Sequence, residues 1–150
     1  MKLKVFSILV GILLLSGTVQ AQPYEHSGGI RAGYTYGLSY KGFFLHSMNA
    51  LEVNLAYNRH GLNISGLYEI HMEPFRKNKQ WLAYFGGGVF GGEWDEDFSM
   101  GLMAVGGIEY TIRKTPLNFG LDWRPMLNAY KNFGYDLLDF GLTIRYRFKL

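Results

Sequence analysis

The chain ends in the stretch Phe140-Gly141-Leu142-Thr143-Ile144-Arg145-Tyr146-Arg147-Phe148-Lys149-Leu150. Every second residue from Phe140 onward is apolar, and the residues between them are glycine, threonine, arginine or lysine. A period of two is typical of a β-strand with one apolar and one polar face. This stretch therefore predicts a strand whose two faces meet very different surroundings.

The same alternation recurs in most of the chain upstream. The segment 117–124 has two such faces, one with Leu117, Phe119, Leu121 and Trp123 and the other with Asn118, Gly120, Asp122 and Arg124. Further alternating segments cover residues 30–35, 38–44, 51–57 and 62–71, and two glycine-rich segments, 81–92 and 99–112, complete the set without a clear assignment of faces. The sequence therefore predicts eight strands.

The connections between these strands are short and rich in turn residues. None is long enough for a crossover helix, so we expect neighbouring strands to form antiparallel hairpins. A meander of this size closes most simply on itself, which predicts an all-β fold, an eight-stranded antiparallel up-and-down β-barrel. Pro125 cannot donate to a strand ladder, so we expect a bulge there or the end of pairing near the barrel rim.

The N-terminal segment predicts export. Lys2 and Lys4 precede an apolar run at 5–15, and small residues lead to Ala21, as in a secretory signal peptide. The run is shorter than the roughly 20 residues of a membrane-spanning helix. We therefore expect cleavage of residues 1–21 and a barrel domain at 22–150.

Composition excludes several classes of site and partner. The chain has no cysteine, which excludes a lipid-modified cysteine, a disulfide framework and a thiolate metal site. Loss of the two leader lysines lowers the formal charge from +3 to +1. The basic isoelectric point therefore gives no reason to expect a nucleic-acid partner.

Two kinds of exported barrel fit the pattern. A lipocalin-like soluble barrel would turn its apolar face inward around a ligand, whereas a membrane barrel turns it outward. The polar face carries glycine, serine, threonine and asparagine with nearly balanced charges, which suits a crowded lumen better than a soluble surface. The apolar face places aromatic residues toward strand ends, as in the girdles of outer-membrane barrels: Tyr57, Tyr110, Trp123, Tyr146 and Phe148. We therefore expect the apolar face to meet lipid.

The phrases at residues 62–69, 107–110, 121–125 and 141–148 resemble the small outer-membrane barrel proteins of the OmpA-like transmembrane-domain type. The last phrase is similar to the terminal signal read by the barrel-assembly machinery, through Gly141, Tyr146 and Phe148, although this chain continues to Lys149 and Leu150. The resemblance implies the outer membrane of a Gram-negative bacterium, with lipids and lipopolysaccharide as surroundings. It rarely implies a reaction.

Ionisable side chains on the polar face predict an ion-pair network in the lumen, because an unpaired buried charge is costly. Its expected members are Arg31, Lys41, Glu52, Glu69, His71, Glu109, Asp122, Arg124, Arg145 and Arg147. With both termini in the periplasm, most of them should lie toward the periplasmic end: Arg31, Glu52, Glu69, His71, Glu109, Arg145 and Arg147. The network is either a gate or a permanent polar core, and the narrow lumen of an eight-stranded barrel favours the core.

Catalytic and metal chemistry have little support in the sequence. His71 lies near Glu69, yet no serine is clearly placed as a nucleophile. The acidic turn at 94–97 offers too few oxygen ligands for calcium. We therefore expect a non-enzymatic, monomeric barrel without cofactor or metal and with a structural or envelope-integrity role. The alternatives are a lipid A-modifying barrel, an acyltransferase or deacylase, and a narrow gated channel for ions or small solutes.

Overall fold

The computed structural model describes residues 24–44, 47–131 and 133–148, and the expected signal peptide lies outside them. The regular elements are all strands: β1 (His26–Gly33), β2 (Tyr36–Phe43), β3 (Asn49–Asn58), β4 (Gly61–Met72), β5 (Trp81–Trp94), β6 (Asp97–Thr111), β7 (Leu117–Trp123), β8 (Met126–Asn128), β9 (Gly134–Asp136) and β10 (Phe140–Phe148). Among these residues, no helix has the length and apolar character needed to cross a membrane.

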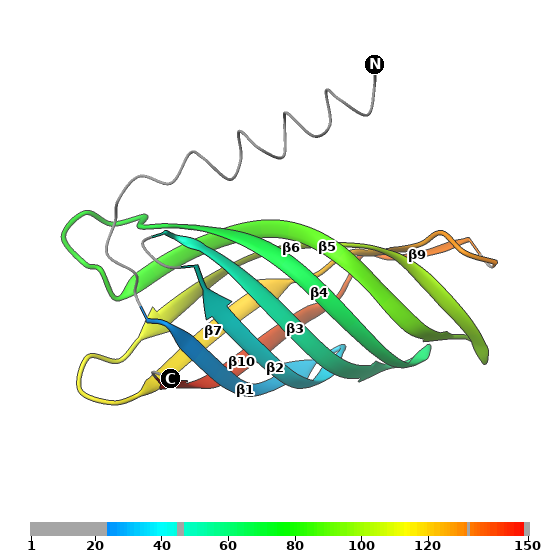
Figure 1. Cartoon of the computed structure of the whole chain (residues 1–150), viewed down its shortest axis with the longest axis horizontal. Helices are drawn as coiled ribbons and strands as arrows, with labels where there is room; N and C mark the ends of the chain where they lie inside the picture. Colours follow the sequence, from blue (N-terminus) through cyan, green and yellow to red (C-terminus); the bar gives the residue numbers. More distant parts are fainter. Residues whose placement is uncertain (1–23, 45–46, 132, 149–150) are drawn as a thin grey trace, which may run out of the picture.

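The sheet closes on itself as a barrel (Figure 1). Strands β1 to β7 pair in chain order, and β10 joins β7 to β1, with His26 opposite Phe148 and Gly33 opposite Gly141. Every pairing is antiparallel. Because β7 and β8 together form one strand of the ring and β9 and β10 form another, the predicted eight-stranded, closed antiparallel barrel is confirmed.

The two ends of the barrel differ. One end holds the start of β1 and the end of β10, and we call it the terminal end. The other holds the turns after β1, β3 and β5 together with the β8–β9 hairpin, and we call it the loop end (Figure 1). The first strand begins at His26 rather than residue 30, since residues 26–29 pair with both β2 and β10.

One strand of the wall is interrupted at Pro125. Strands β7 and β8 keep a single register on β6, with Gly106 opposite Trp123 and Met103 opposite Met126. On their other edge, β7 pairs with β10 and β8 pairs with β9. There residues 124–125 lie opposite three residues, 137–139, so the bulge lies opposite Pro125. Of the two outcomes expected at Pro125, a bulge or the end of pairing, the bulge is observed, and pairing with β6 continues because the Pro125 carbonyl oxygen accepts from the Ala104 N–H at 3.0 Å.

The segment 128–136, expected to be a turn, contains strand β9. It pairs with β8 and extends the wall at the loop end. The hairpin carries exposed apolar side chains, among them Tyr130, Phe133 and Tyr135. Strand β9 was not predicted, because three residues are too few to display a period of two.

Candidate functional site: a charged lumen inside an apolar wall

The barrel has an apolar outer face and a largely polar inner face, the reverse of a soluble protein. Burial alternates residue by residue along β3, β7 and β10. Large apolar side chains on the outer face are about half exposed, including Ile30 at 55%, Val53 at 49% and Ile144 at 45%. The inward residues of the same strands include Arg31, Glu52 and Arg145, each at most 4% exposed. The barrel is therefore apolar outside, and its lumen is lined mainly by polar groups.

Glu52 on β3 is the hub of the lumen. Its carboxylate accepts from the Arg124 guanidinium at 2.7 Å and from the Arg145 guanidinium at 3.1 Å. The Lys41 ammonium lies 3.3 Å away, and the Ser39 hydroxyl donates at 2.9 Å. One fully buried carboxylate thus contacts cations from β2, from β10 and from the residue that follows β7.

Lys41 connects this hub to the terminal end of the lumen. Its ammonium lies 2.6 Å from Glu69 and 3.6 Å from Glu109, and 4.2 Å from the centre of the Tyr84 ring. His71 Nε2 lies 3.5 Å from Glu69. The cation is therefore shared among carboxylates of β3, β4 and β6 and links these strands to β2 inside the lumen.

A second arm of the network reaches the loop end. Arg124 also donates to Asp122 at 2.8 Å, and Arg31 pairs with Asp122 at 2.8 Å and with Asp139 at 2.9 Å. Arg31 donates further to the Thr35 carbonyl in the β1–β2 turn. A continuous chain of ion pairs therefore runs from Lys41 through Glu52, Arg124 and Asp122 to Arg31 and Asp139.

The structure departs from two expectations about this network. Arg31 lies toward the loop end, because β1 starts earlier than the alternation indicated and Arg31 is close to its finish. Arg147 lies apart from the other charges and donates to the carbonyls of Ile112 and Thr115 near the β6–β7 turn. The other predicted members come together in the lumen.

Apolar and aromatic side chains occupy the lumen on both sides of the ion pairs. Leu67, Phe90, Met103 and Met126 belong to a buried cluster that extends to Trp94 at the loop end. At the terminal end Tyr24 packs edge-on against Phe43 and donates to Glu109 at 3.2 Å. One lumen cavity, beside Arg124, Asp139 and Thr35, measures about 10 Å³. That volume holds roughly one water molecule.

A separate polar cluster lies at the loop end. The His60 ring stacks on Trp94 with centroids 3.8 Å apart. Its Nδ1 lies 2.8 Å from Asp95 and its Nε2 lies 3.4 Å from Asp136 of β9. His60 therefore connects the β3–β4 turn, the β5–β6 turn and the β8–β9 hairpin. Within the described part of the chain, its ring meets Arg59, Trp94, Asp95 and Asp136, and no serine or threonine hydroxyl is among these partners.

Tyr34, in the β1–β2 turn, interacts with Asp136 of this cluster, and Arg59 lies 5.9 Å from the centre of its ring. Burial, followed by the carboxylate of Asp136, raises the pKa of Tyr34 to about 12. The phenol is therefore neutral at physiological pH and adds no charge to the loop end.

The predicted girdle and assembly residues have distinct surroundings. Tyr57, Trp123 and Tyr146 are exposed on the outer wall. Tyr110 accepts from the Gln80 amide, and Phe148 stacks on His26. Trp123 lies at the interruption of the wall rather than at a rim and donates to the Leu137 carbonyl at 2.6 Å. Gly141 faces inward, where a Cβ would lie 2.5 Å from Arg31 Cζ.

Sequence reasoning missed several lumen residues. Asp139 has the inward parity of β10, one residue before the predicted strand, so extending the alternation backward would have found it. Tyr84 lies in a glycine-rich segment whose faces carried no clear pattern, and Tyr24 precedes the first strand. No periodic signal marks either tyrosine.

No group of three or more metal-ligating side chains comes together in the described residues. A scan against protein-family models finds no match, and searches of curated proteins and of solved structures find no significant match either.

Proposed function

We propose that this chain is an integral outer-membrane barrel of a Gram-negative bacterium, similar to the OmpA-like transmembrane-domain type, with a structural or envelope-integrity role. Residues 22–150 form the mature, monomeric protein after removal of residues 1–21. Its surroundings are outer-membrane lipids and lipopolysaccharide, and β10 carries the signal for the barrel-assembly machinery. The role requires neither catalysis nor a cofactor.

The inversion of the two faces carries this proposal. Burying a Leu, Ile or Phe side chain is worth roughly 1.5–3 kcal/mol relative to exposure. The outer wall leaves many such side chains half exposed, including Leu38, Leu142 and Val89. A hydrocarbon environment removes that cost, and a closed barrel leaves no unpaired sheet edge in the lipid. A bilayer is therefore the environment that fits this surface.

The filled lumen favours a structural role over transport. Ion pairs at 2.7–3.3 Å cross the lumen between Lys41, Glu52 and Arg124, and packed rings lie at both ends. Opening a path would separate buried charges, which is strongly unfavourable.

Membrane fractionation combined with a gel-shift assay tests the proposal. We expect the mature protein in the outer-membrane fraction, with the unboiled sample migrating as a compact species distinct from the boiled one. Recovery in the soluble periplasm without a shift would overturn the proposal.

The His60–Asp95 pair supports one second candidate, a lipid A-modifying enzyme, because a histidine oriented by a carboxylate is a common general base. The pair lies at the loop end, which would face the outside of the cell. Lipid A from cells with and without the protein, compared by mass spectrometry, tests this candidate. An acyl chain gained or lost only with the intact protein, and not with His60→Ala, would establish the enzyme.

A further inference from the structure

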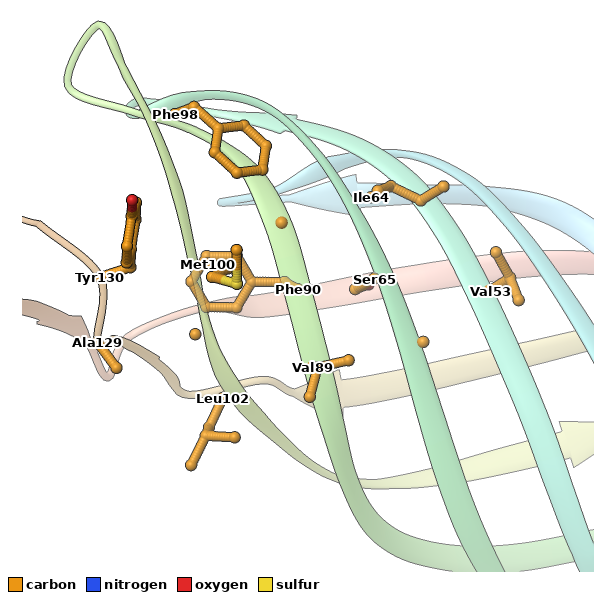
Figure 2. A pocket seen from close by; sticks show the side chains of 13 residues that line it. Val53, Ile64, Ser65, Val89, Phe90, Phe98, Met100, Leu102, Ala129 and Tyr130 are labelled. Carbon is orange, nitrogen blue, oxygen red and sulfur yellow. The ribbon is translucent and has the colours of Figure 1, made fainter.

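The outer wall contains a hollow of about 750 Å³ near the loop end (Figure 2). Two adjacent rows of outward residues form it, each running across the strands. One row joins Val53, Gly66, Val89 and Leu102, and the other joins Ile64, Gly91, Met100 and Ala129. Because strands tilt in a closed barrel, such rows run obliquely along the wall. The hollow is therefore an oblique groove that reaches the β8–β9 hairpin.

Glycines form the floor of this groove. A Cβ built on Gly66 would meet no other atom of the protein within 4 Å. On either side of it, Val53 and Val89 remain 49% and 60% exposed. The groove is thus an open space that the side chains of this chain do not fill.

The chemistry of the groove restricts what can occupy it. Strands β4, β5 and β6 are paired on both edges, so their backbones offer no free ladder to an incoming strand. The side chains around the floor, such as Ile64, Phe98 and Met100, offer apolar contact. A flexible hydrocarbon chain matches such a trough better than a protein segment, whose backbone polar groups would stay unpaired.

A positively charged side chain lies next to the groove where it reaches the β8–β9 hairpin. Tyr130 lines it from the β8–β9 hairpin, and the Lys131 ammonium lies 5.8 Å from the centre of the Tyr130 ring. An apolar trough that ends at an ammonium and a phenol has the polarity of an amphiphile. Lysine binds phosphate as a point charge. Glu96 lies in the β5–β6 turn and Asp97 begins β6, so Lys131 rather than these carboxylates is the group suited to an anionic headgroup.

We propose that this groove seats acyl chains of one lipid A molecule, with a lipid A phosphate at Lys131. The proposal rests on the proposed function, because the outer-membrane orientation places the loop end in the leaflet that contains lipid A. The barrel thus carries a preferred lipid site on the wall formed by β3 to β6, in addition to a general apolar belt.

A matched pair of variants tests the site. Gly66→Leu, on β4, fills the groove, whereas Gly106→Leu adds the same side chain at a glycine of β6 that does not line the groove and whose Cβ would also meet open space. Purified lipid A is titrated into the full mature protein in detergent and bound lipid is counted by native mass spectrometry. We expect one lipid A on the wild type and on Gly106→Leu, and several-fold less on Gly66→Leu. Equal binding by all three proteins would overturn the site.

The headgroup is tested separately. Lys131→Gln should weaken binding of phosphorylated lipid A several-fold and leave binding of dephosphorylated lipid A unchanged. Equal competition by phosphatidylglycerol, or a groove-dependent dimer of the chain, would overturn lipid A as the occupant. The gel shift of each variant separates the two proposals. A wild type with the shift but no lipid A overturns only the site, whereas a wild type without the shift overturns the proposed function.

Discussion

At the scale of single residues, Glu52 shows how a narrow barrel accommodates charge. Its two oxygens meet Lys41, Arg124 and Arg145, and all four side chains are at most 3% exposed. Such a group stabilises the fold only while all its partners are present, because each ion has lost its hydration. The network is therefore most sensitive at its hub.

Glu52→Gln should lower the free energy of unfolding by roughly 3–5 kcal/mol, since it leaves buried cations short of one negative charge. Urea-induced unfolding in lipid vesicles, followed by tryptophan fluorescence, measures the change. Glu96→Gln, at an exposed turn residue, is the control and should change little. Similar midpoints for both variants would show that Glu52 is not the hub.

A second residue-scale prediction concerns the space around Arg31. A Cβ on Gly141 would lie 2.5 Å from Arg31 Cζ, and that guanidinium is held by Asp122 and Asp139. Gly141→Ala should therefore destabilise the barrel by about 1–3 kcal/mol through overpacking. Gly106→Ala, where the new methyl group meets open space, should match the wild type in the same unfolding assay. No difference between the two variants would contradict this prediction.

At the scale of elements, the β8–β9 hairpin depends on side-chain contacts at its free side. Asp136 of β9 lies 3.4 Å from His60 and 3.7 Å from Arg59 in the β3–β4 turn. The hairpin's own pairing is limited to three residues on each strand. The ladder with β6 holds β8, and these contacts hold β9 against the β3–β4 turn.

Asp136→Asn should loosen this hairpin without unfolding the wall. We expect faster proteolysis at residues 129–135 in reconstituted vesicles, and an unfolding midpoint close to that of the wild type. Asp97→Asn, at the first residue of β6, should leave the cleavage rate unchanged. Cleavage that is equally slow in both variants would mean that the hairpin is held by its ladder alone.

At the scale of the whole molecule, the lumen is closed in successive layers. Tyr24 and Phe43 close the terminal end, the ion pairs cross the middle, and the cluster around Trp94 closes the loop end. Protein reconstituted in planar bilayers should therefore show no sustained conductance. Regular single-channel steps from the pure protein would instead support the gated channel.

The sequence predicted the wall of this molecule better than its contents. The period of two is visible in most strands, so the ring, its closure and the chemistry of each face followed from it. In β5 and β6, the many glycines leave no alternating pattern that shows which positions point inward. The sequence therefore did not predict that the rings of Tyr84 and Phe90 fill the lumen. Depth along the barrel was less predictable still. An error of four residues in the start of β1 was enough to place Arg31 at the wrong end of the lumen.

The extra residue at 137–139 has a consequence for how this chain can change. A one-residue insertion inside a paired strand turns every later side chain to the opposite face. At this bulge the chain already carries such an insertion and regains its frame at Phe140, ahead of the inward Gly141, Thr143 and Arg145. The hairpin before it can accordingly be lengthened, shortened or exchanged without turning the side chains of β10 to the opposite face of the barrel. It is the natural position for grafting foreign peptides.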